Sequence, residues 1–241
     1  MKEFILLGDH SERELTRLLS EASLIRDTGE RIAYLSGQLL GTPYKESSLI
    51  GDKDTPEIFV IDLSVVDCFT CLEYVEAMRV SQSFFEFRTN LQKVRYKAGK
   101  ISFGARNHFF TDWSEYNAER IDEVTETIGI NRTVRIEKLL NRNQDGTYFL
   151  DGIQPVLRSI CYLPSESVDE GICSLLKTGD YLGIYARTPG LDVSHAGIII
   201  KNHDAVFFRH ASSQEQYRKV VDEDFRSYIA DKPGMLILRP K

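Results

Sequence analysis

The residue best suited to covalent chemistry is Cys68, which stands where the sequence predicts the start of a helix. Apolar residues recur at positions 68, 71, 72, 75 and 78, the spacing of a buried helix face. Asp67 is expected to be the N-cap, accepting hydrogen bonds from the backbone N–H groups of the first turn. The helix dipole favours negative charge at this end, and therefore a thiolate. Cys68 is the predicted nucleophile.

Two histidines lie on a predicted β-hairpin far downstream, where β-branched and aromatic runs flank a short polar break at 202–203. A two-residue turn at this break, or a four-residue loop over 201–204, sets a register that places His195 directly opposite His210 on one face. Cross-strand partners have Cβ atoms roughly 5 Å apart, so one imidazole can orient the other. With Cys68 as nucleophile, His195 is the predicted base and His210 the orienting group.

This set of residues resembles the NlpC-type, papain-like cell-wall hydrolases, in which a cysteine opens a helix and the histidine and a third polar residue follow on adjacent strands. Two further segments, apart from the one that contains the cysteine, resemble the family. Leu40–Tyr44 resembles the family's segment upstream of the nucleophile. Phe208–Ser213, which reads FRHASS, resembles its HASS segment.

One branch is more similar still, the N-acetylmuramoyl-L-alanine amidase-like family that acts on anhydromuropeptides. Its marks are the runs Asp67–Glu73, Arg106–Trp113 and Gly190–His195. These motifs occur in the family's order and together cover the chain from about Leu39 to Ser213. The chain departs from the family at Cys71, where an apolar or aromatic residue is more usual, and at Phe109, where a tyrosine is more usual. Phe109 has no hydroxyl to make any hydrogen bond that the tyrosine makes to substrate.

The resemblance implies an α+β fold of the papain-like cysteine hydrolase type, with helices packed on a mostly antiparallel sheet, in a single domain over 1–241. It implies that the Tyr44 hydroxyl and the Cys68 backbone N–H stabilise an oxyanion. It also implies that the 106–113 run contacts sugar or peptide, with Trp113 stacking on a sugar face and Arg106 pairing with a carboxylate. The full expected substrate-binding set is Arg106, His108, Asp112, Trp113 and Asp67.

The activity implied is hydrolysis of the amide between the lactyl group of N-acetylmuramic acid, in its 1,6-anhydro form, and L-alanine. An endopeptidase cutting between D-glutamate and the diamino acid is the alternative.

Cys68 and Cys71 also form a C-x-x-C pattern, which suits a thiol–disulfide oxidoreductase but gives the histidines no role. A zinc site lacks a second ligand pair at recognised spacing. A non-catalytic muropeptide-binding module would be expected to lack a triad member, and none is missing in this sequence. No metal or cofactor is expected.

Composition limits the partners and the compartment. The chain of 241 residues carries a net charge of −6, with dispersed basic residues, which argues against nucleic acid. No apolar stretch approaches a membrane span. Four sparse cysteines give no disulfide framework, and Cys161 and Cys173 are expected to be buried. The run at 4–7 is too short for a signal-peptide core, so we expect a periplasmic enzyme if a leader was removed and a cytoplasmic one otherwise.

The elements that must position these residues follow from periodicity and breakers. Residues 11–40 are predicted to be helical, beginning at a Ser11–Glu14 capping box and with a second helical segment over roughly 28–40, and a further helix is predicted over 84–96. A loop carrying site residues is predicted over 101–113. Helices before the cysteine and antiparallel strands after it predict an α+β domain. Strands are predicted at 58–63, 130–139, 148–153, 156–162, 182–186, 195–210 as a hairpin, and 235–238.

Overall fold

A computed structural model describes residues 2–202 and 205–241 of the chain. The chain forms two compact units. Unit 1 comprises Met1–Arg106 and Arg209–Asp222, and unit 2 comprises Asn107–Phe208 and Glu223–Lys241. Each unit is described by itself. The single-domain organisation expected from the sequence stays a prediction.

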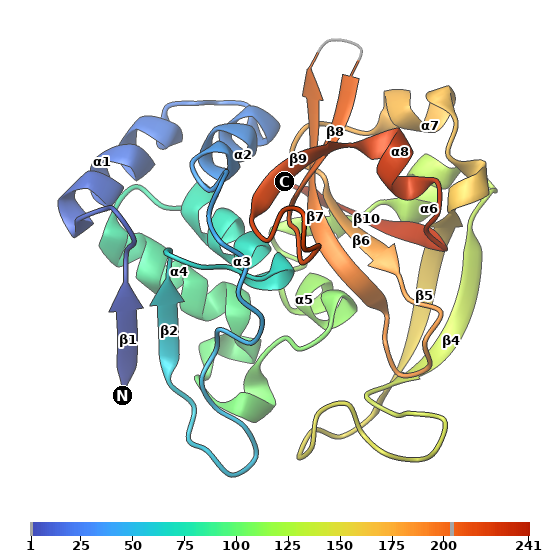
Figure 1. Cartoon of the computed structure of the whole chain (residues 1–241), viewed down its shortest axis with the longest axis horizontal. Coiled ribbons are helices and arrows are strands. Elements are labelled where there is room, and N and C mark those ends of the chain that lie inside the picture. The colour runs from blue at the N-terminus through green and yellow to red at the C-terminus, as the bar shows by residue number, and fades with distance from the viewer. Residues whose placement is uncertain (1, 203–204) are drawn as a thin grey trace. The chain divides into compact units, whose positions relative to one another are not determined.

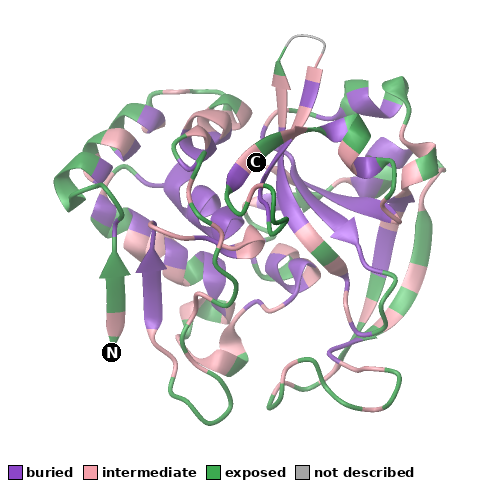
Figure 2. Ribbon diagram, in the orientation of Figure 1, coloured by how far each residue is buried: buried purple, intermediate pink, exposed green. Residues whose placement is uncertain are grey.

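Unit 1 is a helical layer beside a short parallel strand pair (Figure 1). Helix α3 contacts α1, α2 and α4, and its residues from Thr70 to Arg79 are all buried. Figure 2 shows α3 in the colour of buried residues, whereas α1 exposes one side. The elements are β1 (Glu3–Leu6), α1 (Glu12–Ser23), α2 (Thr28–Gly37), β2 (Phe59–Asp62), α3 (Cys68–Arg79), α4 (Phe84–Arg95) and the 3₁₀ turns η1 (Lys97–Gly99) and η2 (Phe103–Ala105).

The helix starts of unit 1 are set by short polar side chains, as the sequence predicts. Ser11 and Glu14 form the expected capping box at α1. Asp27 caps α2 and Ser83 caps α4, each by accepting the backbone N–H of the third residue of the helix. The second helix ends at Gly37, earlier than the expected Leu40.

Helix α3 is more deeply buried than a one-sided apolar stripe predicts, and its charged residues are paired inside. Glu73 accepts from the Arg95 guanidinium at 2.7 Å, and Arg95 also donates to the Val60 carbonyl at 2.6 Å. Glu76 pairs with Arg79 one turn later at 2.6 Å. Pairing offsets the desolvation of these charges, so a polar face of α3 can pack in the interior.

Unit 2 is built on an eight-stranded, mostly antiparallel sheet of order β4-β5-β10-β6-β7-β8-β9, with β3 pairing to β10 (Figure 1). The boundary between the units falls inside β8 and β9. The bounds are β3 (Ile121–Glu123), β4 (Val134–Leu140), β5 (Val156–Pro164), β6 (Tyr181–Tyr185), β7 (Val193–Asn202), β8 (Ala205–Ala211), β9 (Val220–Asp224), β10 (Gly234–Pro240), α5 (Phe110–Tyr116), α6 (Thr125–Gly129), η3 (Ser165–Ser167), α7 (Glu170–Leu175) and α8 (Phe225–Ile229).

The core of unit 2 lies between this sheet and three short helices. Ile184, Ile199 and Phe208 of the central strands pack with Ile172 of α7 and Phe225 of α8. Eight α-helices in the described residues together with this sheet give the α+β class expected from the sequence.

Two local predictions in unit 2 are wrong. Residues 148–153 form no strand; this stretch is held as a loop by the buried Asn141, whose amide bonds the Leu150 backbone and the Ile153 carbonyl. The predicted loop over 101–113 is helical from Phe110, where α5 begins. Among the described residues, no helix is long and apolar enough to cross a membrane.

Candidate functional site

Cys68 is the first residue of α3, where the sequence places it. The Asp67 carboxylate accepts the backbone N–H groups of Phe69 at 3.0 Å and Thr70 at 2.7 Å. In return, the Thr70 hydroxyl oxygen accepts the Asp67 backbone N–H at 2.9 Å. This capping box fixes the backbone on both sides of the cysteine. Asp67 is thus engaged in holding the helix start, while its expected contact with substrate stays a prediction.

Cys68 is also the one cysteine of the four that is not buried. Burial raises the pKa of the Cys71 thiol to about 12, with the nearby Cys68 adding to the effect. Cys71 therefore stays protonated and enclosed near neutral pH, unlike the reactive thiols of a redox pair. All four cysteines are free, and Cys161 and Cys173 are buried as expected.

Tyr44 lies beside the segment that leads into helix α3. It forms a parallel bridge with Val66, and the backbone N–H of Lys45 donates to the Val66 carbonyl at 2.9 Å. Burial, together with smaller electrostatic contributions from the neighbouring Cys68 and Asp67, raises the pKa of the Tyr44 hydroxyl to about 12. The hydroxyl is therefore a stable hydrogen-bond donor across the physiological pH range.

His210 lies in the part of β8 that belongs to unit 1, and its side chain is 2% exposed. The neighbouring Arg209 anchors this segment. Its guanidinium donates two 2.7 Å hydrogen bonds to Asp222, and also binds the Ala33 carbonyl and the Ser36 hydroxyl on α2, both at 3.0 Å. His210 is therefore held on a rigid strand by its neighbour.

His195 lies on β7 in unit 2, paired with Ile184 of β6. Its ring meets Phe208 edge-on, with centroids 6.1 Å apart, and lies 6.4 Å from the ring of Tyr228. The imidazole is half-buried. Two aromatic rings thus restrict its orientation.

The hairpin that carries both histidines is present as β7 and β8, adjacent in the sheet. Strand β7 extends through Asn202, the first residue of the predicted turn at 202–203, and β8 begins at Ala205. His203 and Asp204 lie outside the described residues. The direct pairing of His195 with His210 stays a prediction.

Arg106, expected to bind a substrate carboxylate, already binds a carboxylate of the protein. Its Nε and Nη2 each donate to Glu57 at 2.7 Å in a bidentate pair. The Tyr96 hydroxyl donates to the same Glu57 at 2.6 Å, and the guanidinium stacks 5.3 Å from the Phe103 ring centroid. This cluster joins the 57, 96 and 106 segments of unit 1.

The other expected substrate residues of the 106–113 run lie in unit 2, and two of them are enclosed. Trp113 is 0% exposed and packs against Phe110 and Tyr181, so no face of its indole is open to a sugar. Asp112 is buried and pairs with Arg158 at 2.5 Å. Of the predicted set in this run, His108 keeps a partly exposed side chain.

Two residues that the sequence did not single out stand beside the site segments. In unit 2, the buried carboxylate of Asp192, three residues before His195, accepts the Thr111 backbone N–H at 2.7 Å and the Thr111 hydroxyl at 2.8 Å. In unit 1, the Arg218 guanidinium lies 5.0 Å from the Tyr44 ring centroid. Asp192 is in the 190–195 run that carried the resemblance, whereas nothing in the polar run at 214–219 marks Arg218.

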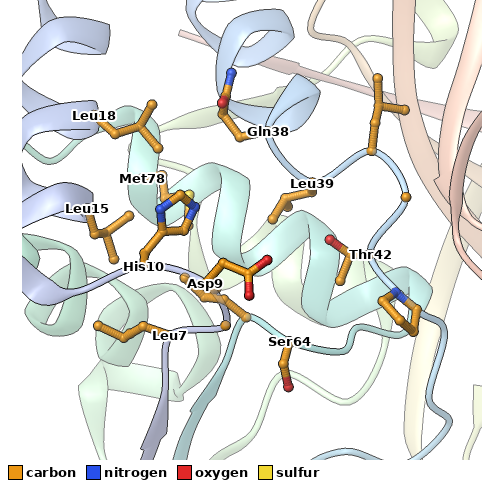
Figure 3. A pocket seen from close by; sticks show the side chains of 15 residues that line it. Leu7, Asp9, His10, Leu15, Leu18, Gln38, Leu39, Thr42, Ser64 and Met78 are labelled. Carbon is orange, nitrogen blue, oxygen red and sulfur yellow. The ribbon is translucent and has the colours of Figure 1, made fainter.

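A pocket of about 410 Å³ in unit 1 is lined partly by the same segments. Thr42 and Pro43, just before Tyr44, form part of its wall, as does Ser64 ahead of Asp67. Figure 3 shows Thr42 and Ser64 across the pocket from Leu15 of α1. Neither Tyr44 nor Cys68 lines it. The described residues hold no cluster of three or more histidine, cysteine or acidic side chains suited to a metal ion.

These features fit one known family. Residues 34–235 match the model of the AmiA-like, N-acetylmuramoyl-L-alanine amidase-like family. The chain belongs to the N-acetylmuramoyl-L-alanine amidase-like family. The matched span includes Tyr44, Cys68, His195 and His210, so the family assignment covers every residue of the predicted catalytic set.

Solved structures agree with this assignment. The chain is similar to an N-acetylmuramoyl-L-alanine amidase from Bacteroides uniformis, with 26% identity and a TM-score of 0.72 over 89% of this chain and 99% of the other. It is also similar to protein LPG0564 from Legionella pneumophila, with 25% identity and a TM-score of 0.78 over 93% of each chain. No curated protein gives a significant match.

Proposed function

We propose that this protein is a cysteine amidase with a papain-like fold that cuts peptidoglycan fragments between the lactyl group of N-acetylmuramic acid and L-alanine. The observation that carries the proposal is the position of Cys68. It is the one cysteine that is not buried, at a capped helix start, in a chain of the N-acetylmuramoyl-L-alanine amidase-like family.

In the proposed reaction, His195 takes the thiol proton of Cys68, and the thiolate attacks the lactyl carbonyl carbon. The C–N bond then breaks, and His195 returns the proton to the nitrogen of the leaving L-alanine. The acyl group remains on the sulfur as a thioester. Water, deprotonated by His195, hydrolyses the thioester and releases the carboxylic acid and the free thiol.

Two donors stabilise the negative oxygen of the tetrahedral intermediates, the backbone N–H of Cys68 and the hydroxyl of Tyr44. The raised pKa of Tyr44 supports this role, because the hydroxyl keeps its proton while charge develops nearby. The bridge between Tyr44 and Val66 supports it too, because Val66 lies two residues before the nucleophile.

His210 is proposed to fix the tautomer of His195 by accepting or donating one hydrogen bond. His195 packs against Phe208 on β8, and side chains of a strand alternate between its faces. Alternation gives residues 208 and 210 the same face of β8, which supports the proposed orienting role. The preference for the 1,6-anhydro sugar rests on the family resemblance.

The test is digestion of a defined disaccharide-peptide followed by mass spectrometry of the products. The proposal expects free disaccharide and an intact stem peptide from the wild type, and neither from Cys68→Ala. A disaccharide that retains L-alanine and D-glutamate would identify an endopeptidase instead. Absence of any cleavage by the wild type would overturn the enzyme assignment.

A further inference from the structure

Arg218 is an exposed cation beside Tyr44, in the same unit as the nucleophile. Its guanidinium carbon lies 5.0 Å from the Tyr44 ring centroid, a cation–π distance. The backbones of the two residues are joined as well, because the Tyr44 N–H donates to the Arg218 carbonyl at 2.9 Å. Arg218 is therefore fixed next to the hydroxyl proposed to bind the oxyanion.

The backbone of Arg218 is held in an unusual conformation. Its φ is +47°, in the left-handed region that non-glycine residues rarely adopt. Hydrogen bonds on both sides hold it there: the Arg218 N–H donates to Gln214, and the backbone of Lys219 bonds Ser212 and bridges Pro43. Residues kept in such strain by their surroundings cluster at binding and catalytic sites.

The charge of Arg218 has no counterpart within the described part of the chain. No described carboxylate forms an ion pair with it, and no described residue accepts a hydrogen bond from its guanidinium, although arginines such as Arg209 and Arg106 in the same unit are paired with carboxylates. A guanidinium held by its ring contact and open to solvent is suited to bidentate binding of a carboxylate ligand.

We infer that Arg218 is a specificity-determining residue that binds a carboxylate of the stem peptide close to the scissile bond. This inference rests on the proposed function. In a stem peptide the first free carboxylate after the lactyl–L-alanine amide is the α-carboxylate of the γ-linked D-glutamate, one residue beyond the bond. A cation beside the Tyr44 oxyanion donor is placed to select that group and to disfavour peptides in which it is amidated.

The experiment compares two disaccharide-peptides that differ only at this group, one with D-glutamate and one with its α-amide. For the wild type we expect a lower KM for the carboxylate form. Arg218→Ala should raise the KM for the carboxylate substrate about tenfold, corresponding to roughly 1.4 kcal/mol, and leave its kcat and the amidated substrate nearly unchanged. Lys45→Ala removes another exposed charge, on the residue that follows Tyr44, and is the matched control, expected to resemble the wild type.

Arg218→Gly guards against misfolding, because glycine accepts a φ of +47° without strain. It should show the same substrate-dependent loss as Arg218→Ala. Equal losses on both substrates, or no loss on either, would overturn the carboxylate assignment. Failure of the wild type to cut either substrate at the lactyl–L-alanine bond would instead overturn the proposed function, and the product masses separate the two results.

Discussion

Asp67 and Thr70 cap the first turn of α3 reciprocally, with hydrogen bonds of 2.7 and 2.9 Å on either side of Cys68. Because Cys68, the proposed nucleophile, lies inside this box, loss of the cap should move it. We expect Asp67→Ala to lower the free energy of unfolding by about 1 kcal/mol and to slow hydrolysis, and Asp67→Asn to keep most stability, since an amide oxygen also caps. Urea denaturation followed by circular dichroism measures this; equal destabilisation by both variants would exclude the capping role.

The two cysteines of α3 should differ in reactivity. Because its pKa is raised to about 12, Cys71 keeps its proton at every pH well below that value and should not be alkylated at pH 6–9. Iodoacetamide should modify Cys68 alone in this range, as read by peptide mass spectrometry. Cys68→Ala should abolish hydrolysis, whereas Cys71→Ser should keep most of it. Equal loss from both, with a measurable dithiol redox potential, would favour an oxidoreductase.

The two histidines should also differ. His195→Ala removes the proposed base and should lower kcat by about 10³-fold or more, comparable to loss of Cys68. His210→Asn should be partly tolerated, because an amide oxygen can accept the hydrogen bond that orients an imidazole. Steady-state hydrolysis of a defined muropeptide gives both values. A His210→Asn variant as inactive as His195→Ala would contradict the assignment of base and orienting residue.

Tyr44→Phe removes one proposed oxyanion donor and should lower kcat by about 10²-fold, with little change in KM. The pH profile gives a second reading. The raised pKa, about 12, means that the donating hydroxyl form persists until the pH approaches that value. Wild-type activity should therefore show no loss assignable to Tyr44 up to about pH 10. A basic limb near pH 10 that disappears in Tyr44→Phe would show that the hydroxyl ionises earlier.

Trp113 should act through packing. It is fully buried between Phe110 and Tyr181, so Trp113→Ala should lower the free energy of unfolding by about 3–5 kcal/mol. Arg106→Ala should also destabilise, because it leaves the buried Glu57 carboxylate without its bidentate partner. Urea denaturation of both variants, compared with His108→Ala at a partly exposed position, tests this. Native stability with loss of disaccharide-peptide binding would restore a direct substrate contact for the two residues.

The sequence predicts those parts of the site whose structure depends only on residues within one helical turn. The start of α3 depends on Asp67 and its neighbours within one turn, and the Ser11–Glu14 box is equally local. Both are confirmed. Burial of α3 on all sides was missed, because the partners that allow it, such as Arg95 for Glu73, lie a helix away in the sequence.

The errors concern contacts between distant segments. Helix α5 begins at Phe110, and its N-cap residue Phe109 offers no capping side chain; the backbone N–H of Thr111 is instead accepted by Asp192, far downstream. The contact of Arg106 with substrate stays a prediction, but its pairing with Glu57 cannot be predicted from the local sequence, because Glu57 lies on a distant segment of unit 1. No local pattern marks Arg218, since its placement depends on its backbone and ring contacts with the distant Tyr44.

The central claim is that Cys68 carries the lactyl acyl group during the reaction. Mixing enzyme with a disaccharide-peptide, quenching in acid within the first turnover and sequencing the peptide that contains Cys68 by mass spectrometry tests it directly. We predict an acyl adduct on Cys68 with the mass of the disaccharide ending at its lactyl carbonyl. An adduct that also contains L-alanine and D-glutamate would contradict the amidase assignment, and an adduct on another residue would contradict Cys68 as nucleophile.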